Sequence, residues 1–417
     1  MATAATTRPG KFLGERELVV IVALLMSLNA LTIDGMLPAL GQMAAEFGVT
    51  NGNERQMVVA VYLLASGVGS LVPGVIADRF GRRPVLLVSL VGYAVLSVLI
   101  TFVHTFWLLL AVRGITGLVA SGLMVVPMAI IRDRYDGDRM ARLMSLVSAV
   151  FITVPVLAPT LGQAVLLVAG WRAIFLGLAG LAMLAAVWVW TRLPESLHPE
   201  DRQHMDLPTI GKNMNKALIR RESIGYVFGS AMLFGAVFGY VNSAQQLIGE
   251  HFQAGTWFPL IFGGTAATLA ISNIVNSRIV ERFGARRVSH AGMIVFVVVS
   301  ALQVWAALYR DGDLAWFIPL MSINLCLLGF LGANFTSIAM QPFEHIAGAA
   351  SSVQTFFRMT GAAVVGLLIG QAYDGTAQPF AFALLIGSVL AFLFVLYSER
   401  GKLFRRFHGM PPGGPAE

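Results

Sequence analysis

The sequence predicts an all-α membrane protein whose twelve transmembrane helices form two six-helix bundles. Hydrophobic residues make up 57% of the chain and charged residues only 12%, whereas a soluble domain carries about 25% charged residues. Apolar segments that approach the ~20 residues needed to cross a bilayer recur along the whole length. A short charged segment also occurs once in each half of the chain. Little of the chain is left for a soluble domain.

The apolar segments can be placed in order. We expect transmembrane helices at 18–40, 57–77, 84–104, 106–131, 143–169, 171–191, 223–248, 257–277, 288–309, 314–337, 348–370 and 376–398. The first segment is too long for the apolar region of a secretory signal, and a second segment follows almost at once. We therefore expect the first segment to remain in the mature protein.

The charged segment lies between the second and third expected helices of each half. Its copies, 74–85 and 277–288, match acid to acid (Asp78 and Glu281) and glycine to glycine at a constant offset. A loop that simply collects basic residues does not explain the matched acid and glycine, so we expect a gating role. The candidate gating residues of this loop are Gly74, Asp78, Arg79, Gly81, Arg82, Arg83 and Glu281.

The repeat divides the chain into bundles at 1–191 and 222–417, the second with a cytoplasmic tail, joined by a cytoplasmic linker at 192–221. If the N-terminus is cytoplasmic, most of the 29 lysines and arginines fall on the cytoplasmic side, as the positive-inside rule requires. We expect a multi-pass protein of a bacterial inner membrane with both termini in the cytoplasm. The net charge of +7 is then a topology signal, and no nucleic-acid partner is expected.

Asp34 is the acid that lies deep inside the first apolar segment, with no basic residue near it in the sequence. A carboxylate inside a bilayer costs several kcal/mol unless it faces a polar cavity or carries a proton. Burial favours the protonated form, and an approaching cation favours the ionised form. We expect Asp34 to carry a coupling proton; the alternative is a permanently protonated carboxyl group bonded to a neighbouring helix.

Two arginines lie inside expected helices. Arg113 lies too deep within 106–131 for its side chain to reach the surface comfortably, so it needs carbonyls, a carboxylate or water. We expect it to support proton coupling, with Asp133 and Arg358 as candidate members of one network. For Arg358 two interpretations are equally open: it belongs to this network, or it lines a cavity.

Pro155, Pro159 and Gly162 interrupt the regular hydrogen bonding of 143–169 and allow another helix to approach closely. We expect a role in gating, and the alternative is a kink that only shapes the bundle. A cavity for varied small molecules needs adaptable apolar surface with a few polar groups. The candidate substrate-binding residues are Asn29, Asp34, Met36, Leu37, Tyr62, Met124, Phe238, Tyr240, Asn242, Asn334, Phe335 and Gln354.

Several of these motifs resemble those of a known family. The run 78–83 after Gly74 resembles the loop motif of the major facilitator superfamily, and 113–117 looks like its intramembrane arginine motif. The run 155–162 resembles the motif associated with antiporters, although Gln163 stands where a second glycine is common. The resemblance implies the major facilitator fold.

Three further runs narrow the resemblance. The segments 33–40, 276–280 and 345–352 are similar to the Bcr/CflA group of drug:proton antiporters, although 354–358 departs from it. The resemblance implies export of amphipathic drugs, lipophilic cations and neutral antibiotics in exchange for protons. We also expect a monomer. The alternative is an exporter of the same fold for one metabolite, amino-acid derivative or siderophore.

Other function classes lack their motifs. No phosphate-binding G-x-x-x-x-G-K-[S/T] loop of a primary pump is present, and the seven histidines do not form H-E-x-x-H. A single cysteine, Cys326, cannot form an intramolecular disulfide or a cysteine-based metal site. We therefore expect a transporter and not an enzyme, with no cofactor. Its expected partners are a small-molecule substrate, protons and the lipid bilayer.

Overall fold

The computed structural model describes residues 13–135, 137–197, 220–311, 313–343 and 347–404. The regular secondary structure within these ranges is helical, so the predicted all-α class is confirmed. The chain folds into two compact units, one of residues 1–208 with 241–267 and one of 209–240 with 268–417. The predicted bundle and linker boundaries stay a prediction, and residues 198–219 of the expected linker lie outside the described residues.

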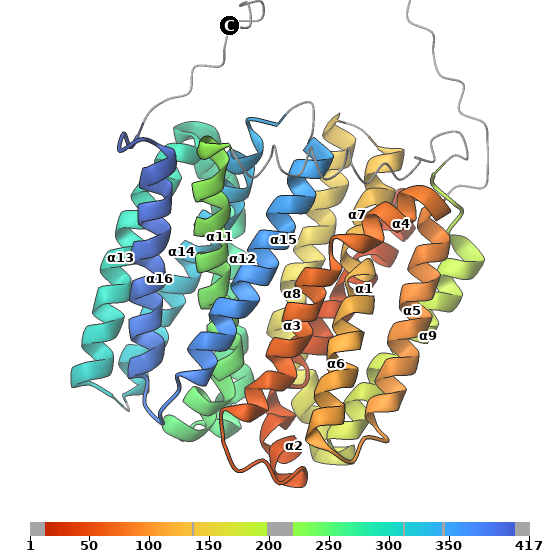
Figure 1. Ribbon diagram of the computed structural model, residues 1–417, viewed down its shortest axis with the longest axis horizontal. Helices are drawn as coiled ribbons and strands as arrows, with labels where there is room; N and C mark the ends of the chain where they lie inside the picture. Colours follow the sequence, from red (N-terminus) through yellow and green to blue (C-terminus); the bar gives the residue numbers. More distant parts are fainter. Residues whose placement is uncertain (1–12, 136, 198–219, 312, 344–346, 405–417) are drawn as a thin grey trace, which may run out of the picture. The chain divides into compact units, whose positions relative to one another are not determined.

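The helices follow the expected order closely (Figure 1). In the first half they are α1 (Glu15–Asp34), η1 (Leu37–Ala39), α2 (Leu40–Glu46), η2 (Glu54–Gln56), α3 (Met57–Gly69), α4 (Val72–Phe80), α5 (Arg82–Ile100), α6 (Phe106–Ala120), α7 (Gly122–Arg134), α8 (Gly137–Ala169) and α9 (Trp171–Arg192). In the second half they are α11 (Arg221–Ala244), η4 (Gln245–His251), η5 (Gly255–Trp257), α12 (Phe258–Phe283), α13 (Ala285–Tyr309), α14 (Leu314–Met340), α15 (Ala347–Gln371) and α16 (Gln378–Ser398).

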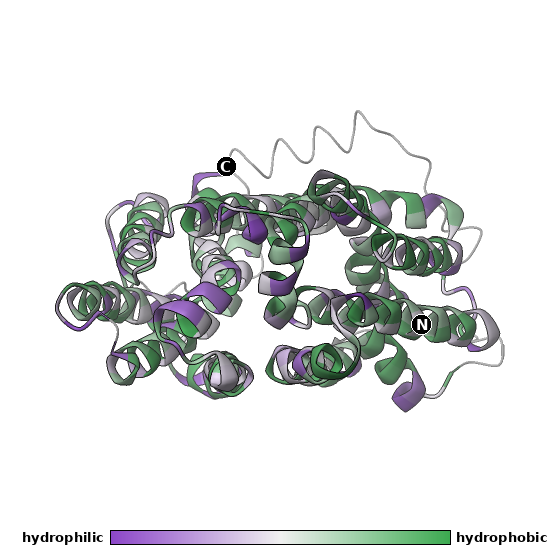
Figure 2. Ribbon diagram, turned by 90° about the horizontal axis from the view of Figure 1, so that it is seen from below, coloured by the Kyte–Doolittle hydropathy of each residue, from purple (hydrophilic) through white to green (hydrophobic). Residues whose placement is uncertain are grey.

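Most of these helices are long and apolar enough to cross a membrane. Ten described spans meet that condition, or eleven when the bent pair α3 and α4 counts as one span. A shorter apolar stretch, Thr153–Ala169 within α8, falls where another span was expected. Hydrophobic residues predominate on the helices (Figure 2), and large apolar side chains such as Val168 and Leu167 are 88% and 78% exposed. Such surfaces suit lipid contact.

Three of the expected spans are interrupted. The first breaks between α1 and η1, the second bends by 46° between α3 and α4, and the fourth is divided into α6 and α7 at Ser121. Pro38 and Pro73 each stand at the start of the element after a break, where the missing proline N–H does not cost a helical hydrogen bond.

Both copies of the repeated loop turn at their glycines. Gly81 has φ of +104° between α4 and α5, and Gly284 has φ of +83° between α12 and α13. A side chain at either position would be strained in this conformation. Glycine is therefore needed at the matched position of both halves for the same reason, the positive φ of the turn.

Candidate functional site

Asp34 is the last residue of α1, directly before the break in the first span. Gly35 and Met36 connect α1 to η1, which starts with Leu37 and Pro38. The Asp34 side chain is buried, and it forms no hydrogen bond or ion pair with any residue that the structure describes. A helix end has backbone carbonyls without helical partners. The break therefore places a buried titratable carboxyl group at a helix end.

The same break is packed against the proline-containing helix α8. A methyl group on Gly162 would overlap the carbonyl oxygen of Gly35, and one on Gly35 would lie 3.7 Å from the carbonyl oxygen of Ala158. Only glycine allows the two backbones to approach this closely. Gly162 thus holds α8 against the peptide that follows Asp34, so a movement of α8 acts directly on the surroundings of the acid.

Arg113 lies at the contact between α3 and α6 and is fully buried. Its Nε donates a hydrogen bond to the carbonyl oxygen of Val58 at 3.1 Å, and its guanidinium carbon lies 4.4 Å from the ring centroid of Tyr62. The Tyr62 hydroxyl in turn donates to Asn29 Oδ1 at 3.0 Å. Arg113 is therefore held by a carbonyl and an aromatic face, and both of its Nη atoms lack a hydrogen-bond partner among the described residues.

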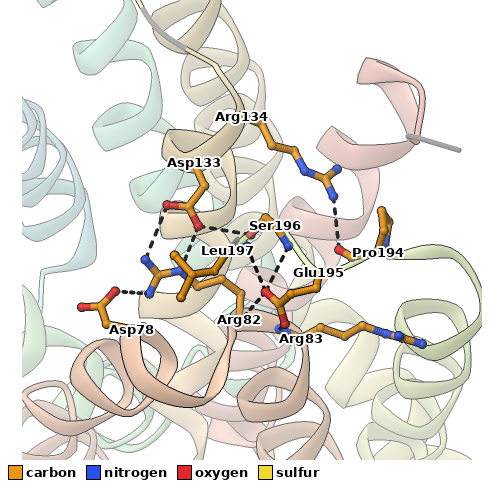
Figure 3. A network of polar contacts seen from close by, with 9 residues as sticks. All are labelled: Asp78, Arg82, Arg83, Asp133, Arg134, Pro194, Glu195, Ser196 and Leu197. Atoms are coloured by element: carbon orange, nitrogen blue, oxygen red, sulfur yellow. Dashed lines mark hydrogen bonds and ion pairs between the residues drawn. The ribbon is translucent and has the colours of Figure 1, made fainter. Parts of the chain in front are cut away.

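A second set of charged residues gathers around Arg82 (Figure 3). Arg82 Nη1 lies 2.5 Å from Asp78 Oδ1 and its Nε lies 2.9 Å from Asp133 Oδ2. The Arg82 side chain is only 5% exposed. This arginine joins three helices, because Asp78 lies on α4, Arg82 begins α5 and Asp133 lies near the end of α7. We call Asp78, Arg82, Asp133 and Glu195 the Arg82 cluster.

Glu195 joins the cluster from the segment after α9. Its carboxylate accepts hydrogen bonds from the backbone N–H groups of Arg82 at 2.9 Å and Arg83 at 3.1 Å, which are free donors at the first turn of α5. A negative charge at this helix N-terminus is also favoured by the helix dipole. A side chain at Gly81 would collide with the Glu195 carboxylate. Glu195 was not among the predicted residues, because residues 194–196 form no motif that assigns this acid a partner.

Neighbouring contacts attach the rest of this segment to the cluster. Ser196 Oγ donates to Asp133 Oδ2 at 3.1 Å, and Arg134 donates to the Pro194 carbonyl oxygen at 3.2 Å. Arg83 donates to the carbonyl oxygen of Trp190. Asp133 thus contacts Arg82 and Ser196, and no contact joins it to Arg113 among the described residues. Arg79 is exposed, with its guanidinium over the ring of Phe80.

The second copy of the loop is built differently. Glu281 is exposed and forms no ion pair with a described residue, and Ala285 stands where the first copy has Arg82. Arg286 instead forms an ion pair with Glu399, Nε to Oε1 at 3.3 Å. Glu399 also accepts a hydrogen bond from the Tyr226 hydroxyl at 2.7 Å. An acid after the last helix of each half therefore contacts the repeated loop, at Glu195 and at Glu399.

Another polar contact lies between η2 and η4, both within the first compact unit. Arg55 Nη2 lies 2.6 Å from Glu250 Oε2, and Gln56 donates to Gln246. Gln246 Nε2 also donates to the carbonyl oxygen of Gly52 at 3.0 Å. The sequence did not predict this contact, because its members are far apart in the chain. It links η4 to η2 within the first unit.

The candidate substrate-binding residues fall into two groups by exposure. Met124 and Phe238 are half-buried, whereas the remaining members are buried: Asn29, Asp34, Met36, Leu37, Tyr62, Tyr240, Asn242, Asn334, Phe335 and Gln354. Asn334 and Asn276 exchange two hydrogen bonds of 3.0 Å, and neither polar atom of the Asn242 side chain has a described partner. The substrate-binding assignment stays a prediction.

These features define a class of protein: a multi-pass helical membrane protein with a helix break beside a buried acid. A family model described as the Major Facilitator Superfamily matches residues 22–366. The chain belongs to this superfamily of transporters, and the predicted fold and family are confirmed.

Individual relatives agree with this assignment. The chain is 25% identical over 385 residues to a bicyclomycin resistance protein homologue of Haemophilus influenzae, covering 90% of this chain and 95% of the relative. It is 25% identical over 379 residues to the multidrug resistance protein MdtL of Vibrio parahaemolyticus, covering 89% and 93%. Its fold is similar to that of the Escherichia coli xylose transporter XylE in a partially occluded inward-open conformation, with a TM-score of 0.69, 14% identity and coverage of 93% and 99%.

Proposed function

We propose that the chain is a proton-coupled antiporter that exports small amphipathic compounds, including drugs, by alternating access. The observation that carries this proposal is Asp34, a buried carboxyl group without a described partner at a helix break. The names of the bicyclomycin and multidrug resistance relatives support drug export as the direction and substrate class. We also propose a monomer in a bacterial inner membrane with both termini in the cytoplasm.

The chemistry of exchange follows from competition at Asp34. A buried carboxyl group binds a proton because desolvation disfavours the charged form, and a lipophilic cation beside it favours release of that proton. Proton and cation then exclude each other from one site. When the site opens alternately to the two sides of the membrane, each outward transfer of substrate is matched by an inward transfer of protons.

The Arg82 cluster suits a gate for this cycle. It connects α4, α5 and α7 with the segment after α9 through ion pairs and through the N-terminus of α5. Packed and ion-paired interfaces of this kind switch between discrete arrangements. We therefore assign Asp78, Arg82 and Asp133 to the conformational step, and Gly162 to the link between α8 and the Asp34 break.

The test is transport by the purified protein in proteoliposomes with an imposed pH gradient and a fluorescent lipophilic monocation. Asp34→Asn should abolish pH-gradient-driven accumulation, because asparagine keeps the size and polarity of aspartate but does not release a proton. Exchange of labelled for unlabelled substrate without a pH gradient should continue, because it needs no net proton transfer. Asp34→Glu is the matched control and should retain part of the driven transport. Full pH-driven accumulation by Asp34→Asn would overturn the proposal.

A further inference from the structure

A small cavity lies within the second compact unit, where α11, α14 and α15 meet. Its volume is about 30 Å³, which is room for about two water-sized groups. Its polar lining residues are Ser230, Thr336, Ser351, Gln354, Thr355 and Arg358. The wall thus offers one guanidinium, one amide and four hydroxyl groups, and no carboxylate of the described residues lines it.

At this cavity Arg358 has no charged partner among the residues that the structure describes. Among the described residues it forms no hydrogen bond or ion pair, and its guanidinium carbon lies 4.9 Å from the ring centroid of Phe234. Contact with an aromatic face compensates only part of the cost of holding a cation away from water. Arg82 and Arg286, by contrast, both pair with carboxylates. The positive charge of Arg358 is therefore available to an external anion.

Gln354 supplies a second unused donor. Its residue is only 8% exposed, and its Nε2 has no hydrogen-bond partner among the described residues. An unsatisfied buried amide is costly. Because Gln354 and Arg358 are separated by one helical turn of α15, they lie on the same face of that helix. Ser351 and Thr355 share this face, and their hydroxyls can donate as well as accept.

We propose that this cavity is a subsite that binds the carboxylate of a transported small molecule. The two oxygens of a carboxylate fit the volume of this cavity, and they can accept two parallel hydrogen bonds from a guanidinium. The rest of the ligand must lie outside a cavity of this size. This inference rests on the proposed export function and extends its substrates from cations to zwitterions and organic acids. Arg358 and Gln354 would be the residues that distinguish an acid from its ester.

The experiment compares two dyes that differ only at this group, a rhodamine with a free carboxylate and its ethyl ester. Fluorescence anisotropy measures the affinity of the full chain in neutral detergent for each dye, at a pH where the acid is ionised. Arg358→Gln should lower the ratio of acid affinity to ester affinity about tenfold, the loss expected for a charge-assisted hydrogen bond. Arg358→Lys should retain part of the ratio. Arg282→Gln, which removes a charge from the same unit outside the cavity, should leave the ratio unchanged.

The proposal would be overturned if Arg358→Gln had the same ratio of acid affinity to ester affinity as the wild type. It would also be overturned if the acid bound to neither the wild type nor the variant. An unchanged ratio would also be obtained if the cavity held only a free inorganic anion. Gln354→Leu gives a second measurement if Arg358→Gln does not fold, and it should lower the ratio in the same direction. Transport of the ester driven by a pH gradient tests proton-coupled export separately, because the ester has no carboxylate. If the ester were not transported, the measured ratio of binding affinities would still stand.

Discussion

The two copies of the repeated loop share an acid and a glycine, but they are connected to the protein in different ways. In the first copy Arg82 pairs with both Asp78 and Asp133, and Glu195 caps the helix that starts at Arg82. In the second copy Ala285 replaces that arginine and Glu281 is exposed. The two copies thus differ at the position of Arg82 and Ala285. The first loop joins three helices through this arginine, and the second makes the same turn without such a cluster.

The comparison separates a backbone role from an electrostatic role. Gly81 and Gly284 both have positive φ, so the turn needs glycine in both halves. The acid needs an arginine four residues later before it can pair within the loop, and only the first half has one. We therefore propose that the first copy carries more of the gating than the second copy, whose contact is the Arg286–Glu399 ion pair.

The largest effect is expected for Arg82→Ala. The change leaves the partly exposed carboxylates of Asp78 and Asp133 without their shared partner, and the loss of a hydrogen bond to a charged group costs about 1.5 to 3 kcal/mol. Under the proposed gating role the cluster stabilises one conformation, so we expect the maximal transport velocity to fall at least about tenfold, with substrate affinity changed much less. Initial rates in proteoliposomes over a range of substrate concentrations measure both quantities.

The control for Arg82→Ala is Arg132→Ala, which removes an exposed arginine of α7 next to Asp133. It should leave the velocity near that of the wild type. A loss of affinity without a loss of velocity in Arg82→Ala would assign the cluster to substrate binding instead of gating.

Smaller effects are expected for the paired acids. Asp78→Ala should lower the maximal velocity severalfold, less than Arg82→Ala, because Arg82 keeps its contact with Asp133. Glu281→Ala should change the velocity less than twofold, the usual outcome for exposed charges. Velocities measured side by side for the two variants test the difference between the copies directly. Equal losses would show that the second copy gates as strongly as the first.

The positions of the helices were predictable because hydropathy reports span length without any tertiary information. The loop turn was predictable as well, since a glycine between two helices has a local cause. The partner of Arg82 was not, because Asp133 is 51 residues away in the sequence and no local pattern ranks it above other acids. Glu195 was missed because its role depends on the position of the α5 N-terminus.

The surroundings of Asp34 were predictable only in part. Pro38 lies four residues after the acid, where a proline disfavours a regular helix, and the structure places the break directly after Asp34. The contact between Gly162 and Gly35 was not predictable, because it depends on how α8 packs against α1. The same limit applies to Arg358, where the sequence left a network and a cavity as alternatives, and the structure places this residue at a cavity wall.

Proton release on substrate binding tests the central claim most directly. Purified protein in weakly buffered detergent, at a pH where Asp34 is protonated, is mixed with the monocation tetraphenylphosphonium while a pH indicator records the solution. If proton and cation compete at Asp34, the wild type should release up to one proton per chain, and Asp34→Asn should bind the cation without release. Equal proton release by the wild type and Asp34→Asn would contradict the account.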